Sequence, residues 1–494
     1  MKKVFSVLIA LCIALSCASP VFAAQNPCAC GNLPIVLVSG MGAMPFLQDA
    51  GTQAETVCFP PHPDIPKLAV RAVGGLFLSL VSFNLKPFAN AAADIALELL
   101  GVMACDADGN TLYDVTPVLI EGAMAQQEPE LYEQAQDAEF AIIRSAVQAV
   151  GADHVYYYNY DWRLDPMTNA ADLAAYIDRV RSETGHQKVR LAACSMGGVQ
   201  TMAYLQQYGC EKIDTIWFLS AAYCGLLFVT NVFAGELQFS QESFFGWLQT
   251  LEVGSAATDQ AFDALMDWCA HTVLLRPLFR LLNRSTESVN SIVVDRVIRR
   301  TLSTMPGMWS FVRDDRYAEA KRAMLPQDAS EAFVQRIDAY HNDVQVRREE
   351  ILRRAQDSGV QIVVFSHYNN GCVPVTSSAM AHGDNLIETV CSSGGATVAD
   401  YGSRLPAGYT QHGCNTHNHL SADGVIDAST CMFPDSTWFI KNMAHVGCKK
   451  DSAYAEMLRW FFAQQTQPTV FSDARYPQFL QTDAASQMTL SPVE

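Results

Sequence analysis

The chain has little positive charge. It carries 33 lysine and arginine residues against 51 aspartate and glutamate residues, which gives a formal net charge of −18. Proteins that bind nucleic acid or anionic membranes through charge need basic surfaces, so this balance argues against both functions. The chain also lacks tandem repeats and long low-complexity linkers, and its length suits two average domains or one large domain with insertions.

The apolar run at the amino terminus is too short to span a membrane. Residues 1–3 are basic, residues 4–18 are apolar, and residues 21–23 offer small side chains for cleavage. This order predicts a secretory signal peptide over residues 1–24 and therefore a secreted, extracellular protein. Cys17 follows a poor version of a lipoprotein box, so lipid anchoring is the minor alternative.

Cysteine use follows from this predicted export. Thirteen of the 15 cysteines lie beyond the predicted cleavage site, and in an exported chain they are disulfide candidates. The odd number leaves at least one thiol free or intermolecular, and Cys194 suits that role. Proximity in sequence suggests three pairs: Cys58 with Cys105, Cys391 with Cys414, and Cys431 with Cys448.

Near-continuous apolar runs predict strands that are buried on both faces of a parallel sheet. These runs cover residues 33–39, 155–160, 189–193, 215–220, 361–366 and 436–441. Helical stretches lie between or after them, as at residues 170–181 and 453–462. This alternation predicts the α/β class, with functional residues at the carboxyl ends of the strands.

We expect one α/β domain over residues 33–465 with two long helical insertions, at about 46–150 and 237–357. Insertions of this length are usually lids or caps over an active site. The apolar segment 65–104 has two interpretations: a helix that contacts a lipid surface, or an ordinary buried helix pair, which we favour slightly. Residues 466–494 form a polar tail, which we expect outside the core.

The segment 188–198 is a short apolar strand followed by a turn of small residues and then by a helix. Its centre, Ala193-Cys194-Ser195-Met196-Gly197, matches the pattern G-x-S-x-G with alanine at the first position. A strand–turn–helix of this kind is typical of a nucleophile elbow, in which the turn exposes a serine hydroxyl above the sheet. The alternative is a structural turn. We take Ser195 as the candidate nucleophile.

Such a serine needs backbone N–H groups that stabilise an oxyanion. These groups usually come from the residue after the serine and from the loop after an early strand. The corresponding residues are Met196 and, in the loop Gly40-Met41-Gly42, Met41.

The general base is expected late in the chain. His445 follows the predicted strand at 436–441 and precedes the predicted helix at 453–462, so we take it as the base. Its rivals lack this position between a strand and the closing helix. They are His367, His382, His412, His417 and His419.

The acid that orients the base should lie between the serine and the histidine. Asp423 begins an Asp-Gly turn followed by apolar residues, and it is the preferred candidate, with Asp427 and Asp435 behind it. The order Ser…Asp…His is that of α/β-hydrolases and differs from the orders in trypsin and subtilisin.

A second group has the residue types of a zinc site. It comprises His412, Cys414, His417 and His419. The spacing matches no common structural zinc site, and Cys414 has disulfide partners available, so the favoured interpretation is a loop over the catalytic groove. We assign no metal and no cofactor, and the sequence singles out no substrate-binding residue.

Several motifs resemble the lecithin–cholesterol acyltransferase and lysosomal phospholipase A family. Tyr160-Asp161-Trp162-Arg163 resembles a fairly specific tetrapeptide of that family, residues 193–198 resemble its elbow, and residues 422–426 resemble its acid turn. The early strand with residues 40–42 resembles its oxyanion strand. The resemblance implies an α/β-hydrolase fold, a serine acyl-enzyme and ester-lipid substrates. It also implies that Asp161 and Arg163 brace strand ends rather than take part in catalysis.

This sequence departs from the family pattern at three points. Ala193 replaces a glycine, no proline occurs in residues 221–225, and the separation between Asp423 and His445 is short. Three functions follow as expectations. The first is a secreted serine esterase of the lipase type, the second is acyl transfer from a lipid to another alcohol, and the third is a catalytically silent lipid- or glycan-binding protein.

Overall fold

The computed structural model describes most of the chain from residue 31 onward. The described residues are 31–61, 65–82, 84–127, 138–238, 240–248, 256–277, 279–280, 286–374, 376, 381–414 and 416–494. The predicted signal peptide and Cys17 lie outside them. In the described part, no helix combines the length and apolar character that a membrane span requires.

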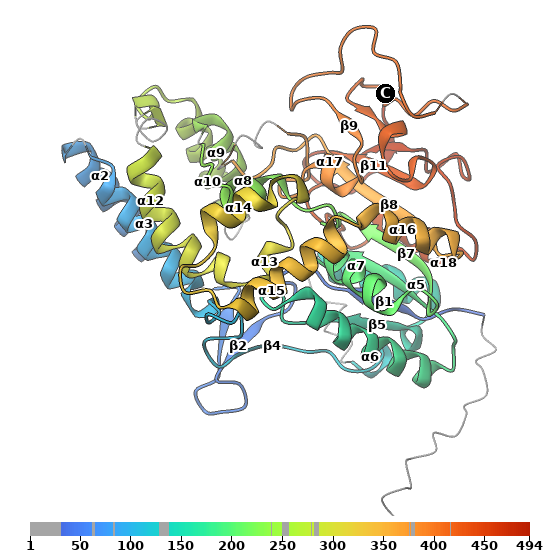
Figure 1. Ribbon diagram of the computed structural model, residues 1–494. Coiled ribbons are helices and arrows are strands. Elements are labelled where there is room, and N and C mark those ends of the chain that lie inside the picture. The colour runs from blue at the N-terminus through green and yellow to red at the C-terminus, as the bar shows by residue number, and fades with distance from the viewer. Residues whose placement is uncertain are drawn as a thin grey trace, which may run out of the picture.

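An eight-stranded sheet forms the centre of the molecule (Figure 1). Its strand order is β5-β1-β6-β7-β8-β11-β12-β13, and every neighbouring pair is parallel except β12 with β13. The six strands predicted from apolar runs all lie in it: β1 (Ile35–Val38), β5 (Val155–Tyr158), β6 (Val189–Cys194), β7 (Ile213–Leu219), β8 (Gln361–Tyr368) and β11 (Thr437–Lys441). β1 and β6 are buried along their whole length, as expected for strands covered on both faces.

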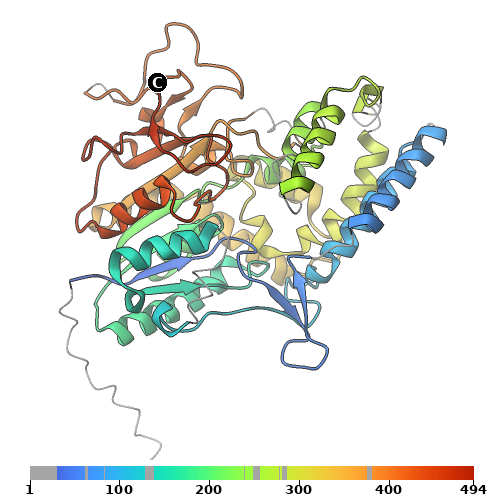
Figure 2. The same cartoon turned by 180° about the vertical axis from the view of Figure 1, so that it is seen from behind.

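Helices cover both faces of this sheet. On one face α6 (Pro166–Thr184), α7 (Gly197–Tyr208) and α16 (Arg348–Asp357) share a core with alternate side chains of β1 and β6. On the other face α5 (Ala138–Val150) packs beside α18 (Ala453–Ala463), as Figure 2 shows from behind. The site-bearing turns therefore sit on a rigid three-layer body.

Local sequence explains where the helices of this body begin. The Asp165 side chain accepts a hydrogen bond from Met167 N at 3.0 Å, and Pro166 occupies the first turn of α6. Ser452 caps α18 in the same way through Ala455 N at 3.1 Å. Gly185 ends α6 with a φ of 70°, a left-handed conformation that suits glycine.

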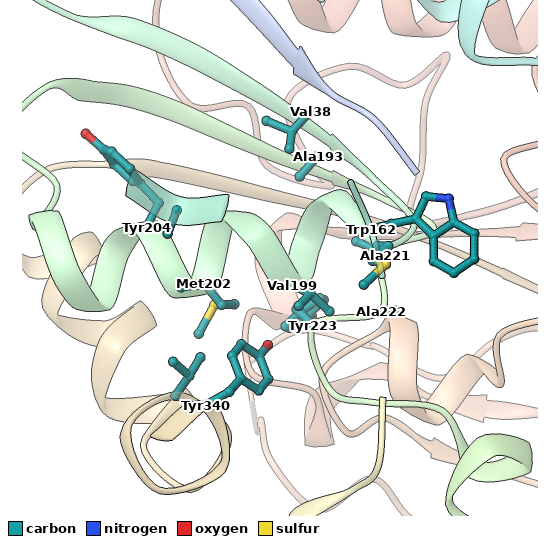
Figure 3. Packing of buried hydrophobic residues seen from close by; sticks show 14 of the residues in the cluster. Val38, Trp162, Ala193, Val199, Met202, Tyr204, Ala221, Ala222, Tyr223 and Tyr340 are labelled. Atoms are coloured by element: carbon teal, nitrogen blue, oxygen red, sulfur yellow. The ribbon is translucent and has the colours of Figure 1, made fainter. Parts of the chain in front are cut away.

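The core beneath α7 is rich in aromatic and small side chains (Figure 3). Val199 and Met202 on α7 belong to one buried cluster with Tyr223 and Tyr340, and all four are almost fully buried. This packing fixes α7 against β6 and the segment after β7.

The first insertion contains more strand than predicted. It contains a three-stranded sheet of order β3-β2-β4, formed by β2 (Phe46–Gln48), β3 (Thr56–Phe59) and β4 (Val115–Pro117). The predicted apolar helix pair lies between β3 and β4 in the chain as α2 (Ile65–Ser82) and α3 (Lys86–Leu100), which pack together. Residues 138–150 are not part of the insertion, because α5 covers the main sheet.

The second insertion is helical, as predicted. Its helices are α9 (Gln241–Leu248), α10 (Ala256–His271), α12 (Thr286–Arg296), α13 (Pro306–Trp309), α14 (Tyr317–Met324) and α15 (Glu331–Tyr340). α12 packs on α3, so the two insertions join into one helical projection to the side of the sheet (Figure 1). The short helix α8 (Leu227–Phe233) connects β7 to this projection.

The carboxyl-terminal tail is part of the sheet, contrary to expectation. β12 (Phe479–Gln481) pairs with β11, and β13 (Ser491–Pro492) pairs with β12. Leu480 is fully buried between them. A three-residue strand has too short a pattern to stand out from polar surroundings, so the composition of residues 466–494 was misleading.

The Asp161–Arg163 pair braces neighbouring segments, as the resemblance implies. The Arg163 guanidinium is fully buried, donates to both oxygens of Asp161 at 2.9 and 2.6 Å, and donates to Val115 O at 2.8 Å. It also lies over the Phe46 ring at 5.2 Å. The end of β5 is thus tied to β2 and β4.

None of the three suggested disulfides is formed. None of the 11 cysteines of the described residues takes part in a disulfide, and these 11 include both members of each suggested pair and Cys194. Proximity in sequence misled here because the suggested partners belong to different elements. Cys58 Sγ, for example, lies 3.4 Å from Phe46 O and does not bond to Cys105.

Replacing Arg163 with methionine should destabilise the fold strongly. It leaves the Asp161 carboxylate and the Val115 carbonyl without their buried donor, and breaking such a pair costs about 3–5 kcal/mol. Urea unfolding measures the loss. The double variant Asp161→Asn/Arg163→Met should lose less than the two single variants combined. A loss below about 1 kcal/mol for Arg163→Met would contradict the bracing role.

Candidate active site

Ser195 lies at the turn between β6 and α7 with a left-handed backbone. Its φ is 48°, which is uncommon for a residue with a side chain and carries a cost of about 1–3 kcal/mol. The turn is held on both sides, because Ser195 N donates to Leu219 O at 3.2 Å and Ser195 O accepts from Ala222 N at 2.9 Å. This is the strand–turn–helix geometry that the sequence predicts.

The two small residues of the motif, Ala193 and Gly197, are explained by different features of the structure. A Cβ at Gly197 would lie 2.1 Å from Val38 O, so only glycine permits α7 to approach β1 this closely. Ala193 lies within β6, where it pairs with Val38 and Phe218 and is fully buried. An alanine is compatible with that strand position, which explains the departure from G-x-S-x-G.

His445 lies in the loop after β11 and faces the serine, as predicted. Its Nε2 atom is 3.0 Å from Ser195 Oγ. Its Nδ1 atom is 2.9 Å from Asp384 Oδ2. Ser195 is 8% exposed and Asp384 is 0% exposed, so both partners of the His445 imidazole are buried.

The loop that carries His445 is fixed by residues at and just after the end of β8. Asn370 Nδ2 donates to Met443 O at 2.7 Å, and His367 Nδ1 lies 3.0 Å from Ala444 O. Because a carbonyl only accepts, this contact assigns the proton to His367 Nδ1. Burial lowers the pKa of His367 to about 4, so the ring is neutral and acts as a support.

Asp384 occupies the position that the sequence analysis gave to Asp423. Asp384 Oδ1 accepts hydrogen bonds from Leu386 N at 3.0 Å and Ile387 N at 2.7 Å, which leaves Oδ2 for His445. Burial alone would raise the pKa of Asp384, but its polar surroundings, with the charge and hydrogen bond of His445 foremost and the Ile387 amide among them, lower that pKa overall. The carboxylate is therefore ionised and accepts the Nδ1 proton.

Asp423 does not contact His445, so its predicted role is corrected. Its Oδ2 accepts from Tyr368 Oη at 3.0 Å and from Lys441 Nζ at 2.8 Å. Burial raises its pKa, but the Lys441 and Ser421 hydrogen bonds and the Lys441 charge lower it overall. Asp423 thus links the last residue of β8 to the last residue of β11, from which the His445 loop starts.

The two reserve acids also have other partners. Asp427 Oδ1 accepts from Ser429 N and Ser429 Oγ, and Asp427 Oδ2 accepts from Tyr409 Oη at 2.9 Å. Asp435 lies near His417 and His419. Neither carboxylate contacts His445 in the described structure.

One signal in the sequence pointed away from Asp423. The separation between Asp423 and His445 is short for the resembled family, whereas Asp384 precedes His445 by 61 residues. Both aspartates lie in the connection between β8 and β11, so chain order alone could not separate them. Which of the two aspartates contacts His445 depends on how the long connection folds against the sheet, and this is set by tertiary packing and not by local sequence.

The predicted oxyanion loop lies against the serine. A Cβ at Gly40 would approach Ser195 Cβ to 3.0 Å and Glu139 Oε1 to 2.8 Å. Gly40 N is already used, because it donates to Glu139 Oε1 at 2.6 Å. No described residue accepts a hydrogen bond from the amides of Met41 or Met196, so both stay the candidates for oxyanion stabilisation.

The rival histidines do not reach the serine. His367 supports the loop that carries His445. His382 is buried, and its ring centroid lies 6.2 Å from that of Tyr368. The His412 ring makes an edge-to-face contact with the Tyr409 ring, with the two centroids 5.2 Å apart. His417 and His419 lie together with Cys414, away from the line of Ser195, His445 and Asp384.

Comparison with known proteins supports this reading of the fold. A family model described as the alpha/beta hydrolase fold matches residues 144–342, which include β5, α6, β6, the Ser195 turn and α7. The parallel sheet, the elbow and the order Ser…Asp…His agree with that match. The fold is that of the α/β-hydrolases.

Two solved structures are similar to this chain at low identity. One is "The crystal structure of Tle4-Tli4 complex", with 10% identity, coverage of 69% of this chain and 75% of that chain, and a TM-score of 0.29. The other is a putative aryl esterase from Burkholderia cenocepacia, with 13% identity, coverage of 67% and 94%, and a TM-score of 0.16.

Exchanging the two candidate acids distinguishes their roles. Asp384→Asn keeps the shape but presents an N–H or a weaker acceptor to His445, so the wrong imidazole tautomer faces Ser195. We expect the rate of Ser195 labelling by a fluorophosphonate to fall about 10³–10⁴-fold. The matched variant Asp423→Asn should label within about tenfold of the native rate while losing stability. The opposite ranking would contradict the geometry.

Proposed function

We propose that this α/β-hydrolase is a serine hydrolase that cleaves carboxylic esters through an acyl-enzyme on Ser195. The observation that carries the proposal is the continuous contact from Ser195 Oγ through His445 to Asp384, at 3.0 and 2.9 Å. A serine with a purely structural role does not require a strained backbone that directs its hydroxyl towards an imidazole. A fixed nucleophile with its base and orienting acid in line is the arrangement for acyl transfer.

The geometry supports the following steps. Asp384 holds the Nδ1 proton of His445, so Nε2 presents a lone pair to the Ser195 hydroxyl. Ser195 Oγ attacks the ester carbonyl as His445 takes its proton. The amides of Met41 and Met196 donate to the developing oxyanion, and His445 then protonates the leaving alcohol. Water repeats the sequence on the acyl-enzyme and releases the acid.

Lipid esters are the proposed substrate class. α2 exposes an apolar stripe at helical spacing, formed by Val70, Phe77, Leu78 and Val81, each more than half exposed. Trp268 on α10 is also more than half exposed in the same helical projection. Apolar side chains that face solvent on a cap are typical of a surface that contacts lipid. The tetrapeptide at 160–163 agrees with this class.

The site of action proposed is outside the cell. The support comes from the sequence alone, in the basic, apolar and small-residue order of residues 1–24. An acidic protein with an apolar patch would reach lipid through hydrophobic contact rather than through attraction to anionic headgroups.

Removing the nucleophile tests the proposed reaction. Ser195→Ala should lower kcat for p-nitrophenyl butyrate by at least about 10⁴-fold, because no other group forms the acyl-enzyme. Ser145→Ala is a matched control, since Ser145 is a buried serine on α5 that bonds only to Ala141 O in the described structure. A Ser195→Ala protein with the native rate would refute the mechanism. Product analysis with an added alcohol separates hydrolysis, which yields free acid, from acyl transfer.

Polar substitution of the α2 stripe tests the lipid assignment separately. The variant Val70→Ser/Phe77→Ser/Val81→Ser should bind phosphatidylcholine vesicles at least about tenfold more weakly, because each side chain loses its transfer free energy. Hydrolysis of soluble p-nitrophenyl acetate should be unchanged. Leu119→Ser is the control, because Leu119 is 58% exposed outside the stripe. Equal vesicle binding by the triple variant would remove the support for a lipid surface.

A further inference from the structure

A cluster of metal-binding side chains lies in the β8–β11 connection. Ligand atoms of Cys414, His417 and His419 all lie within 4.8 Å of one another. Asp435, in the short 3₁₀ turn Pro434–Ser436, adds a carboxylate: its Oδ1 is 3.4 Å from His419 Nε2 and 4.0 Å from His417 Nδ1. His412, which the sequence grouped with these residues, is not among the close ligand atoms, and its ring contacts Tyr409.

Hydrogen bonds at the opposite side of the ring fix the tautomer of His419. Gln478 Nε2 donates to Pro434 O at 2.7 Å and to Thr437 O at 3.2 Å, so Gln478 Oε1 is the acceptor end of that amide. His419 Nδ1 lies 2.8 Å from this oxygen and must donate its proton to it. In the neutral ring, Nε2 then carries a lone pair directed into the cluster.

That lone pair has no hydrogen-bond partner. His419 is fully buried, and its Nε2 is an unsatisfied polar atom among the described residues. The nearest charged atom is the Asp435 carboxylate oxygen, which is also an acceptor. Two acceptors 3.4 Å apart repel each other unless a positive charge lies between them.

The backbone of the cluster is held by one side chain. Gln411 Nε2 donates to Cys414 O and, at 2.6 Å, to His417 O. Gln411 Oε1 accepts from His419 N at 2.9 Å. A single amide thus positions the main chain of all three loop donors, which is the outer support that metal ligands usually have.

We propose that Cys414, His417, His419 and Asp435 bind one Zn²⁺ ion. One thiolate, two imidazoles and one carboxylate are a donor set that zinc accepts in tetrahedral sites. Such ligands lie roughly 3.3–3.6 Å apart when the metal–ligand bonds are about 2.0–2.3 Å. The His419–Asp435 separation already has this value, the His417–Asp435 separation is 4.0 Å, and the ligand atoms of Cys414, His417 and His419 lie within 4.8 Å of one another. Binding of the ion would draw these donors closer together.

The site is open to entry from solvent but closed once filled. His417 is 48% exposed and Asp435 is 57% exposed, so an ion reaches the cluster without unfolding. Four protein donors leave no position for a reacting water, which indicates a structural ion. No described hydrogen bond joins the four donors to Ser195, His445 or Asp384.

The ion would tie the loop that carries three of the donors to the turn that begins β11. β11 leads directly to the His445 loop, and Gln478 links the same turn to β12. Closing this connection removes freedom from the unfolded chain. The proposed role is therefore stabilisation of the amino end of β11, at the other end of this strand from the His445 loop and independent of which ester the enzyme cleaves.

Metal analysis of the untagged full-length protein tests the proposal. Elemental analysis should find one zinc per chain, and metal-free protein should regain it on titration with Zn²⁺ alone. Cys414→Ser and His417→Gln, both at residues that are not buried, should weaken zinc binding by at least about tenfold. His412→Gln is the matched control from the same loop and should bind like the native protein.

A second readout identifies the sulfur ligand. The Co²⁺-substituted protein should show a sulfur-to-cobalt charge-transfer band that Cys414→Ser lacks, and zinc should protect Cys414 from alkylation. The proposal is overturned if the native protein takes up no zinc on titration, or if Cys414→Ser and His417→Gln bind zinc like the native chain. A disulfide at Cys414 found by peptide mapping would also overturn it. A different resident divalent metal at the same stoichiometry would overturn the zinc assignment.

Discussion

The close approach of α7 to β1 is the constraint on which the candidate site depends. Gly197 has no side chain because Val38 O occupies the space where a Cβ would lie. This contact, with the hydrogen bonds from Ser195 N to Leu219 O and from Ala222 N to Ser195 O, holds Ser195 in its left-handed conformation. The packing of the sheet's buried core offsets the backbone strain at Ser195. In this conformation the Ser195 hydroxyl points towards His445.

The other parts of the site are arranged around this fixed serine. The Gly40 loop lies against Ser195 Cβ and is held by Glu139. The His445 loop is held by Asn370 and His367 from the end of β8. Asp423 and Lys441 join the ends of β8 and β11 beneath it. Each of these supports is a buried or half-buried polar contact, and together they keep the imidazole within reach of the hydroxyl.

The strands, the elbow and the base were predictable because each depends on local pattern. Apolar runs marked the sheet, small residues marked the turn at Ser195, and the position between a strand and the last helix marked His445. The acid was not predictable in this way, because Asp384 and Asp423 share one long connection and differ only in how the loop folds. The strands of residues 466–494 were missed since their burial comes from pairing with β11, and the suggested disulfides failed because sequence proximity does not bring thiols together.

Trapping the acyl-enzyme tests the central claim most directly. The protein is mixed with excess p-nitrophenyl butyrate, quenched in acid within the first turnover, digested and analysed by tandem mass spectrometry. The account predicts a butyryl group on Ser195 in the native protein, with faster accumulation than in Asp384→Asn. An acyl group on another residue, or product release with no acyl group on Ser195, would contradict it.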